Sequence, residues 1–435
     1  MQSIAVKARQ QPMVLVLEDC HWLDALSHDL LEMVGRSSAD LPLVILLTLR
    51  HTNLERIREA RVSKLLNYSA INLTPLTEDD LAQLARLRLL HKAGPNGVTA
   101  VSDALASRIA RQAEGNPFYL EELVNYVGEE MMGGRDADAL QQVELPSSLQ
   151  SLVLSRLDQL GERRKTLLKV ASVIGRVFRA SWLAGVYPEL GTVDEIRSDL
   201  SILTQQNMTV YDPTEAEDSY SFRHIITRGV IYDSLLHKMR TTLHEQTGQF
   251  LEDAYPDAQE QFLDLLAYHF EHGLSEDKKR FYLRRAGEVA QHTYANDAAI
   301  HYFRTVLPLV QPDEQVDILL KVGEVEKLVG QWDDAQALFE EALALAREIG
   351  DETAVGWSQA ALGEMLRLQG NYTEAVTWLA QARAVFEAID DPQGLAQVLH
   401  YSGTVAAQQG DLQAAEDQYM QSLTLRREQL SLIHI

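Results

Sequence analysis

The sequence contains a single cysteine and no long uninterrupted run of apolar residues. One cysteine, Cys20, excludes a disulfide within the chain and a zinc site built on several cysteines, and it fits a reducing cytoplasm. The longest apolar runs, 13–17 and 41–49, fall short of the roughly 20 residues that a membrane-spanning helix needs. We therefore expect a cytoplasmic protein without a membrane-spanning segment.

Positive charge is also scarce. The 435 residues include 39 Lys and Arg against 63 Asp and Glu, so the formal net charge is −24. Because such a field repels polyanions, the composition argues against a generic nucleic-acid surface and against binding to an anionic membrane. Hydrophobic residues make up 46% of the chain and charged residues 23%, which is typical of folded domains rather than disordered segments.

The N-terminal residues 1–75 alternate between strand and helix patterns. An apolar strand pattern at 13–17 precedes a helix pattern at 25–34, and a second apolar strand pattern follows at 43–49. This alternation is typical of parallel strands, and uninterrupted apolar strands favour burial on both faces of the sheet. We expect part of an α/β core here, with a weaker third strand at 71–73.

From residue 76 onward the patterns are mainly helical. In the predicted helical domain 76–135, Thr77 and Asp80 open a helix in the manner of a capping box. The next predicted domain, 146–250, combines helices with two short strand patterns at 208–211 and 220–222. Helices followed by a small hairpin are typical of a winged helix.

The last third of the chain repeats itself with a period of 40 residues. Gly323, Gly363 and Gly403 define one column of the repeat. Four further columns keep the period: Gly330, Gly370 and Gly410; Ala335, Ala375 and Ala415; Phe339, Leu379 and Tyr419; Ala342, Ala382 and Ser422. An earlier unit, Ala286, Ala298 and Tyr302, fits less well.

These columns predict stacked helical hairpins. Glycine and alanine let the two helices of a pair approach closely, the aromatic residue or leucine is expected to fill the groove against the next pair, and Gly330 ends a helix with positive φ. Because one pair cannot bury its apolar face alone, residues 251–429 are expected to form an α-solenoid resembling tetratricopeptide repeats. Residues 430–435 are suspected to be a non-native tail.

Two acids, Glu18 and Asp19, follow the first strand directly. The carboxyl ends of parallel strands form the edge at which α/β folds bind ligands. In nucleotide hydrolases one such acid holds Mg²⁺ and another orients the attacking water. The alternative is that both acids only solvate the strand end or cap a helix, and the residues by themselves leave this choice open.

The residues around these acids resemble the Walker B region of the STAND class of signal-transduction P-loop ATPases. Segment 17–24 reads Leu-Glu-Asp-Cys-His-Trp-Leu-Asp, and strand 46–50 ends in Arg50. Similar segments continue in the family order: Glu114–Phe118, Leu145–Gln150 with Ser155–Asp158, and Phe222–His224 with Val230–Leu236. The resemblance implies a mainly α protein with a partial α/β P-loop core, a helical lid, a winged-helix-like domain and repeats, as in bacterial adenylate-cyclase-associated and transcriptional-regulator proteins.

The same resemblance implies a site for ATP and Mg²⁺. Glu18 and Asp19 would be the catalytic residues, one or both holding the metal, Arg50 would sense the γ-phosphate, and Gly115 and Pro117 would face the adenine. The family's phosphate-binding Gly-x-x-x-x-Gly-Lys-Ser/Thr does not occur in the sequence and is expected upstream of residue 1. Without its backbone donors and lysine, we expect ATP affinity to fall by about a thousandfold and hydrolysis to be unmeasurable.

Three functions fit these observations. The first is an ATP-dependent regulatory module in which nucleotide state controls the binding of a protein partner to the repeats, with homo-oligomerisation left open. The second is an accessory region of an adenylate or guanylate cyclase or of a protein kinase, although no signature of either enzyme occurs in the sequence. The third is a repeat scaffold that works without nucleotide. A fourth function, a DNA-binding regulator, conflicts with the net charge of −24, and none of the first three requires direct contact with nucleic acid.

Overall fold

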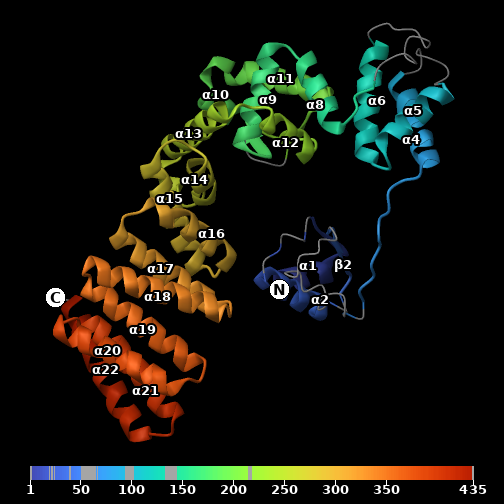
Figure 1. Cartoon of the computed structure of the whole chain (residues 1–435). Coiled ribbons are helices and arrows are strands. Elements are labelled where there is room, and N and C mark those ends of the chain that lie inside the picture. Colours follow the sequence, from blue (N-terminus) through green and yellow to red (C-terminus); the bar gives the residue numbers. More distant parts are fainter. Residues whose placement is uncertain are drawn as a thin grey trace. The chain divides into compact units, whose positions relative to one another are not determined.

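The computed structural model describes residues 2–18, 20, 23, 25–38, 41–49, 65, 67–93, 102–132, 145–213 and 218–433 (Figure 1). Within these residues the chain is mainly helical, and it divides into two compact units, 1–152 and 153–435, each with its own packing. No helix among the described residues is both long enough and apolar enough to cross a bilayer.

The first unit begins with a small parallel sheet. Helix α1 (Gln2–Gln10) precedes strand β1 (Met13–Leu17), and α2 (Ala25–Ser37) connects β1 to strand β2 (Leu43–Leu47). The strands pair in parallel, with Met13 opposite Leu43 and Leu17 opposite Leu47. The predicted strand–helix–strand order and the parallel pairing are therefore confirmed.

Two expectations for this sheet are wrong. One face of each strand is open, since Val14 and Val44 are 67% and 61% exposed. Residues 71–73 are not a strand, and Ile71 and Leu73 are 82% and 92% exposed. Two apolar residues around one asparagine are too few to form a stable ladder without a neighbouring strand to pair with.

A cluster of three helices follows in the first unit: α4 (Glu78–Ala93), α5 (Asp103–Ala113) and α6 (Pro117–Met132). Thr77 caps α4 as predicted, because its Oγ1 accepts from the backbone N–H of Asp80 at 3.2 Å and donates to the Asp80 carboxylate at 2.6 Å. Buried residues of all three helices, including Leu89, Ile109 and Leu123, form one core. Helix α8 (Leu149–Gln159) begins against this core through Leu152.

The second unit opens with helices around a three-stranded antiparallel sheet. The strands are β3 (Val177–Arg179), β4 (Thr209–Asp212) and β5 (Ser219–Phe222), in the order β3-β5-β4. The surrounding helices are α9 (Glu162–Ile174), α10 (Ala180–Val186), α11 (Val193–Gln205) and α12 (Ile225–Asp233). The predicted hairpin of β4 and β5 is confirmed, whereas the three-residue β3 had no recognisable pattern. The winged-helix assignment itself stays a prediction.

The rest of the unit is a stack of helices that run from α13 to α22 (Figure 1). They are α13 (His237–Ala254), α14 (Leu263–Glu271), α15 (Glu276–His292), α16 (Asn296–Val306), α17 (Pro312–Leu328), α18 (Trp332–Ile349), α19 (Glu352–Leu368), α20 (Tyr372–Ala388), α21 (Pro392–Gln408) and α22 (Leu412–Ile433). Each unit of the 40-residue period is one pair, α17–α18, α19–α20 or α21–α22. The predicted helical repeats are therefore confirmed.

The glycines of the repeat have two roles in a pair: one lies where the two helices pack together, and the other follows the end of the first helix. A Cβ on Gly323 would lie 2.4 Å from the ring of Phe339, and one on Gly363 would lie 2.7 Å from the side chain of Leu379. The large residue thus packs onto the glycine of its own pair, and its predicted packing against the next pair stays a prediction. Gly330 follows the end of α17 with φ +84°, which confirms the predicted helix end.

The earlier repeat unit was misaligned by one residue. The structure pairs Gly287 of α15 with Phe303 of α16, and a Cβ on Gly287 would lie 2.6 Å from that ring. Phe303 and Ala299 are fully buried, whereas the predicted Ala298 is half-buried. Alanine at 286 resembles the small-residue column closely enough to hide the true register.

Candidate functional site

Glu18 lies where the nucleotide hypothesis requires, at the carboxyl end of β1. Its side chain is exposed, and the backbone continues beside β2, because Cys20 N–H donates to the Thr48 carbonyl at 2.8 Å. Asp19 and Arg50 lie outside the described residues. Among the residues that are described, no three His, Cys, Asp or Glu side chains gather closely enough to hold a metal ion.

The Gly115-Asn116-Pro117 segment forms the turn between α5 and α6. Asn116 Oδ1 accepts from the N–H groups of Phe118 and Tyr119 at 2.9 and 3.3 Å, and Pro117 occupies the first helical position. Gly115 has φ +82°, and its carbonyl accepts from Leu76 N–H at 3.0 Å. A Cβ on Gly115 would lie 2.6 Å from Pro75 Cβ, so the glycine is needed for the turn itself.

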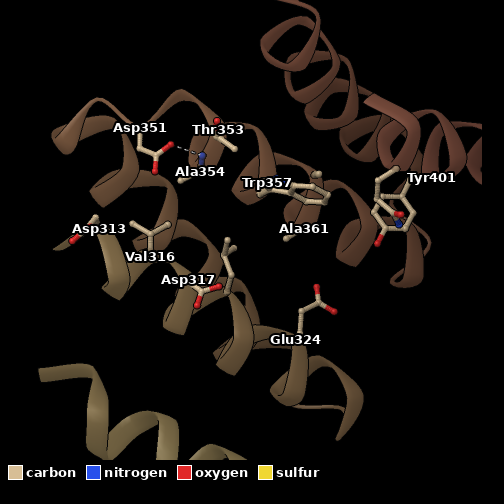
Figure 2. A pocket seen from close by; sticks show the side chains of 13 residues that line it. Asp313, Val316, Asp317, Glu324, Asp351, Thr353, Ala354, Trp357, Ala361 and Tyr401 are labelled. Atoms are coloured by element: carbon tan, nitrogen blue, oxygen red, sulfur yellow. Dashed lines mark hydrogen bonds between the residues drawn. The ribbon is translucent and has the colours of Figure 1, made fainter. Parts of the chain in front are cut away.

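A groove of about 470 Å³ lies on the repeat helices α17, α19 and α21 (Figure 2). Its lining residues all come from the first helix of each pair and from the residue that caps α19. They are Asp313, Val316, Asp317, Leu320 and Glu324, then Asp351, Thr353, Ala354, Trp357, Ala360 and Ala361, and finally Gln397 and Tyr401. Figure 2 shows Asp317 and Glu324 on one helix, with Trp357 and Tyr401 on the helices beyond them.

The groove exists because α19 carries small residues at its centre. Positions 40 residues apart are structurally equivalent, so Ala360 corresponds to Leu320 and His400, and Ala361 corresponds to Lys321 and Tyr401. The neighbouring repeats therefore place long side chains where the middle repeat has two methyl groups. Beside this hollow, Trp357 is half-buried and meets the buried Phe386 edge to face, with ring centroids 5.3 Å apart.

The charge of the groove is one-sided. Four of its lining residues are acids, Asp313, Asp317, Glu324 and Asp351, and no lining residue is Lys or Arg. Burial raises the pKa of Tyr401, the hydrogen bond with Gln397 opposes this, and the nearby carboxylates of Glu324 and Glu364 add to the rise because they disfavour a phenolate. The groove is thus an apolar hollow whose charged lining residues are all carboxylates.

This groove is not predicted from the sequence, because the prediction of the repeats rests on the positions that carry the same kind of residue in every unit. The residues that line it occupy columns that differ, such as Asp317, Trp357 and Gln397, which are 40 residues apart. The signal that could have revealed the groove is a set of equivalent positions in the first helices at which residue type changes from repeat to repeat. Packing alone would favour similar residues at such positions.

Apart from the groove, a buried polar cluster joins α12, α13 and α14. His244 and His269 are fully buried, and their Nδ1 atoms lie 3.0 Å apart, while His244 Nε2 lies 2.9 Å from the hydroxyl of Tyr232. One Nδ1 must donate and the other accept, so two charged imidazoles do not fit. The pKa of both histidines is lowered to about 3, mainly because burial disfavours the charged ring, with the neighbouring His272 and Arg228 contributing in the same direction.

Comparison with known proteins identifies the repeats. The family model of the tetratricopeptide repeat matches residues 314–388 and 357–428. An uncharacterized protein of Rhizobium meliloti (strain 1021) is 26% identical over 249 residues, which are 57% of this chain and 23% of that protein. The chain thus spans about a quarter of the length of this curated relative.

Two solved structures are similar at low identity. A signal transduction ATPase with numerous domains and a tetratricopeptide repeat sensor, from Pyrococcus horikoshii, gives a TM-score of 0.39 at 12% identity, covering 98% of this chain and 64% of its own. Aspartyl phosphate phosphatase F from Bacillus subtilis gives 0.36 at 13% identity, covering 76% of each chain. The helices of the 40-residue period thus match the family model of the tetratricopeptide repeat over residues 314–428, and this part of the chain consists of repeats of that kind.

Proposed function

We propose that the repeats are a protein-binding module and that the groove on α17, α19 and α21 is where a segment of the partner docks. The observation that carries the proposal is the hollow over Ala360 and Ala361, a concave space built where equivalent positions of other repeats carry large side chains. Stacked repeats offer extended binding surfaces of this kind, because each pair adds one helix to the same face.

We further propose that the intact protein couples this binding to ATP and Mg²⁺. The support is the place of Glu18 at the carboxyl end of β1, in a strand pair that runs parallel. A carboxylate oxygen suits Mg²⁺, and Asp19 and Arg50 would complete the phosphate side of the site. Gly115 and Pro117 form a turn that would meet the adenine. A repeat scaffold without nucleotide is the alternative.

A peptide selection on the full chain tests the docking proposal. We expect a random displayed peptide library to yield peptides that bind the natural chain but not Ala361→Tyr, because tyrosine fills the hollow. Tyrosine is the residue at the equivalent position 401, so the repeat fold is expected to tolerate the change, and circular dichroism checks this. Peptides that bind both chains equally, or no recovered peptide, would contradict the proposal.

The nucleotide proposal has its own expected result. Because no phosphate-binding loop occurs in the sequence, we expect the purified chain to show no Mg²⁺-dependent ATP hydrolysis above background. A release assay for inorganic phosphate measures this. Turnover that requires Mg²⁺ and disappears in Asp19→Asn would contradict this expectation and would show that these residues hydrolyse ATP without the loop.

A further inference from the structure

We infer that the groove selects a basic segment of the partner protein, with an arginine side chain seated against Trp357 and the acids of α17. This inference rests on the proposed docking function and adds the chemistry of the ligand. Three features of the lining support the inference: its charged residues are all acids, Trp357 forms an aromatic wall, and Ala360 and Ala361 have small side chains.

The charge favours a cation. Asp317 pairs with Arg284 at 2.8 Å and Lys321 at 3.0 Å, and Glu324 pairs with Lys327 at 2.6 Å, all from outside the lining. Among the described residues no ion pair reaches Asp313 or Asp351, which also line the groove. An incoming cation therefore meets four carboxylates, two of which, Asp313 and Asp351, have no basic partner in the described part of the chain, although Asp351 Oδ1 also accepts from the N–H of Ala354 at 2.9 Å. An acidic segment would be repelled.

The shape favours arginine over a compact cation. A guanidinium is planar, stacks on an aromatic face and donates in a fork to carboxylates, whereas an ammonium needs more water around it. Trp357 offers an indole wall that the buried Phe386 holds in place, and Asp317 and Glu324 lie across from it (Figure 2). The methyl groups of Ala360 and Ala361 leave room for the aliphatic stem of the side chain.

The test is the binding of labelled peptides to the full chain, followed by fluorescence anisotropy at low and at high salt. The probe is a nine-residue peptide with Arg-Leu-Arg at its centre, compared with peptides that carry Lys, Gln or Glu in place of both arginines. We expect the arginine peptide to bind at least about tenfold more tightly than the glutamine peptide, and its affinity to fall as salt rises. The lysine peptide should lie between them, and the glutamate peptide should not bind.

Variants of the chain test where in the groove the arginine side chain binds. We expect Asp317→Asn and Glu324→Gln each to weaken the arginine peptide by about fivefold, and Trp357→Leu by about tenfold. Glu314→Gln is the matched control, because Glu314 contacts the same Arg284 at 3.0 Å but does not line the groove. It should leave affinity unchanged. Equal losses in Glu314→Gln and Asp317→Asn would assign the effect to the ion-pair network and overturn the inference.

Failure of the inference can be told from failure of the docking function. If glutamine and arginine peptides bind equally and Ala361→Tyr abolishes both, the groove binds peptides but does not select arginine. If Ala361→Tyr leaves arginine-peptide binding unchanged, the groove is not the site and both proposals are wrong. Circular dichroism of each variant confirms that the helices are intact before binding is compared.

Discussion

Replacing Phe386 by alanine should destabilise the repeats by about 3–5 kcal/mol, one of the two largest effects that we expect in this chain. The ring is fully buried and lies between two glycines, so that a Cβ on Gly356 or Gly394 would come within 2.7 or 2.3 Å of it. Because glycines have no side chain that can move into the vacated space, the cavity left by the ring cannot collapse. Trp357 would also lose its edge-to-face partner.

Hydrogen exchange of the full chain measures this loss of stability at individual helices. The amides of α19, α20 and α21 should open with a free energy lowered by the predicted amount, whereas amides of α5 and α6 should be unaffected. Val376→Ala, on the same helix as Phe386 but 48% exposed, is the matched control and should change stability by less than about 0.5 kcal/mol. A loss below about 1 kcal/mol in Phe386→Ala would mean that the glycines do not hold the ring as described.

Acid should destabilise the second unit through the buried histidine pair. Folding lowers the pKa of His244 and His269 from 6.5 to about 3, so the unfolded chain binds protons that the folded chain does not. The stability that this difference supplies is complete above pH 6.5 and is lost as the pH falls toward 3. Between pH 7 and pH 5 the expected loss is about 2 kcal/mol for each histidine.

Urea unfolding at pH 7, 6 and 5 measures this loss, with hydrogen exchange assigning it to α13 and α14. His269→Gln removes one titrating ring and should reduce the dependence on pH by about half. His237→Gln, an exposed residue on α13, is the control and should leave the dependence unchanged. Neither variant changes the groups that act on the pair, which are Tyr232, Arg228, Arg240, Tyr268 and His272. Equal slopes for the natural chain and His269→Gln would contradict the assignment.

The parts of the fold that sequence predicted well are those with a strong local pattern. Glycines at 323, 363 and 403 indicated the helical pairs, because a Cβ at 323 or 363 would come within 2.7 Å of a neighbouring side chain, and the apolar patterns at 13–17 and 43–49 predicted the parallel strands. The third strand at 71–73 failed because a strand also needs a partner. The first repeat unit failed by one residue because Ala286 stands beside Gly287.

The candidate sites were harder to predict. Glu18 could be placed from the strand that precedes it, since the end of a strand is a local property. The groove could not, because Asp317, Trp357 and Tyr401 are far apart in sequence and only the stacking of three helices brings them together. For Gly115 the structure shows a tight turn that needs glycine for its own geometry, and the predicted contact with the adenine stays a prediction.

Photo-crosslinking of the arginine peptide to the full chain tests the central claim most directly. A peptide with a photoreactive group beside its Arg-Leu-Arg centre should label the first helices α17, α19 and α21, at or next to residues that line the groove, and the labels should be lost in Ala361→Tyr. Labels on α18, α20 or α22, or labels that persist in Ala361→Tyr, would show that the partner segment binds elsewhere.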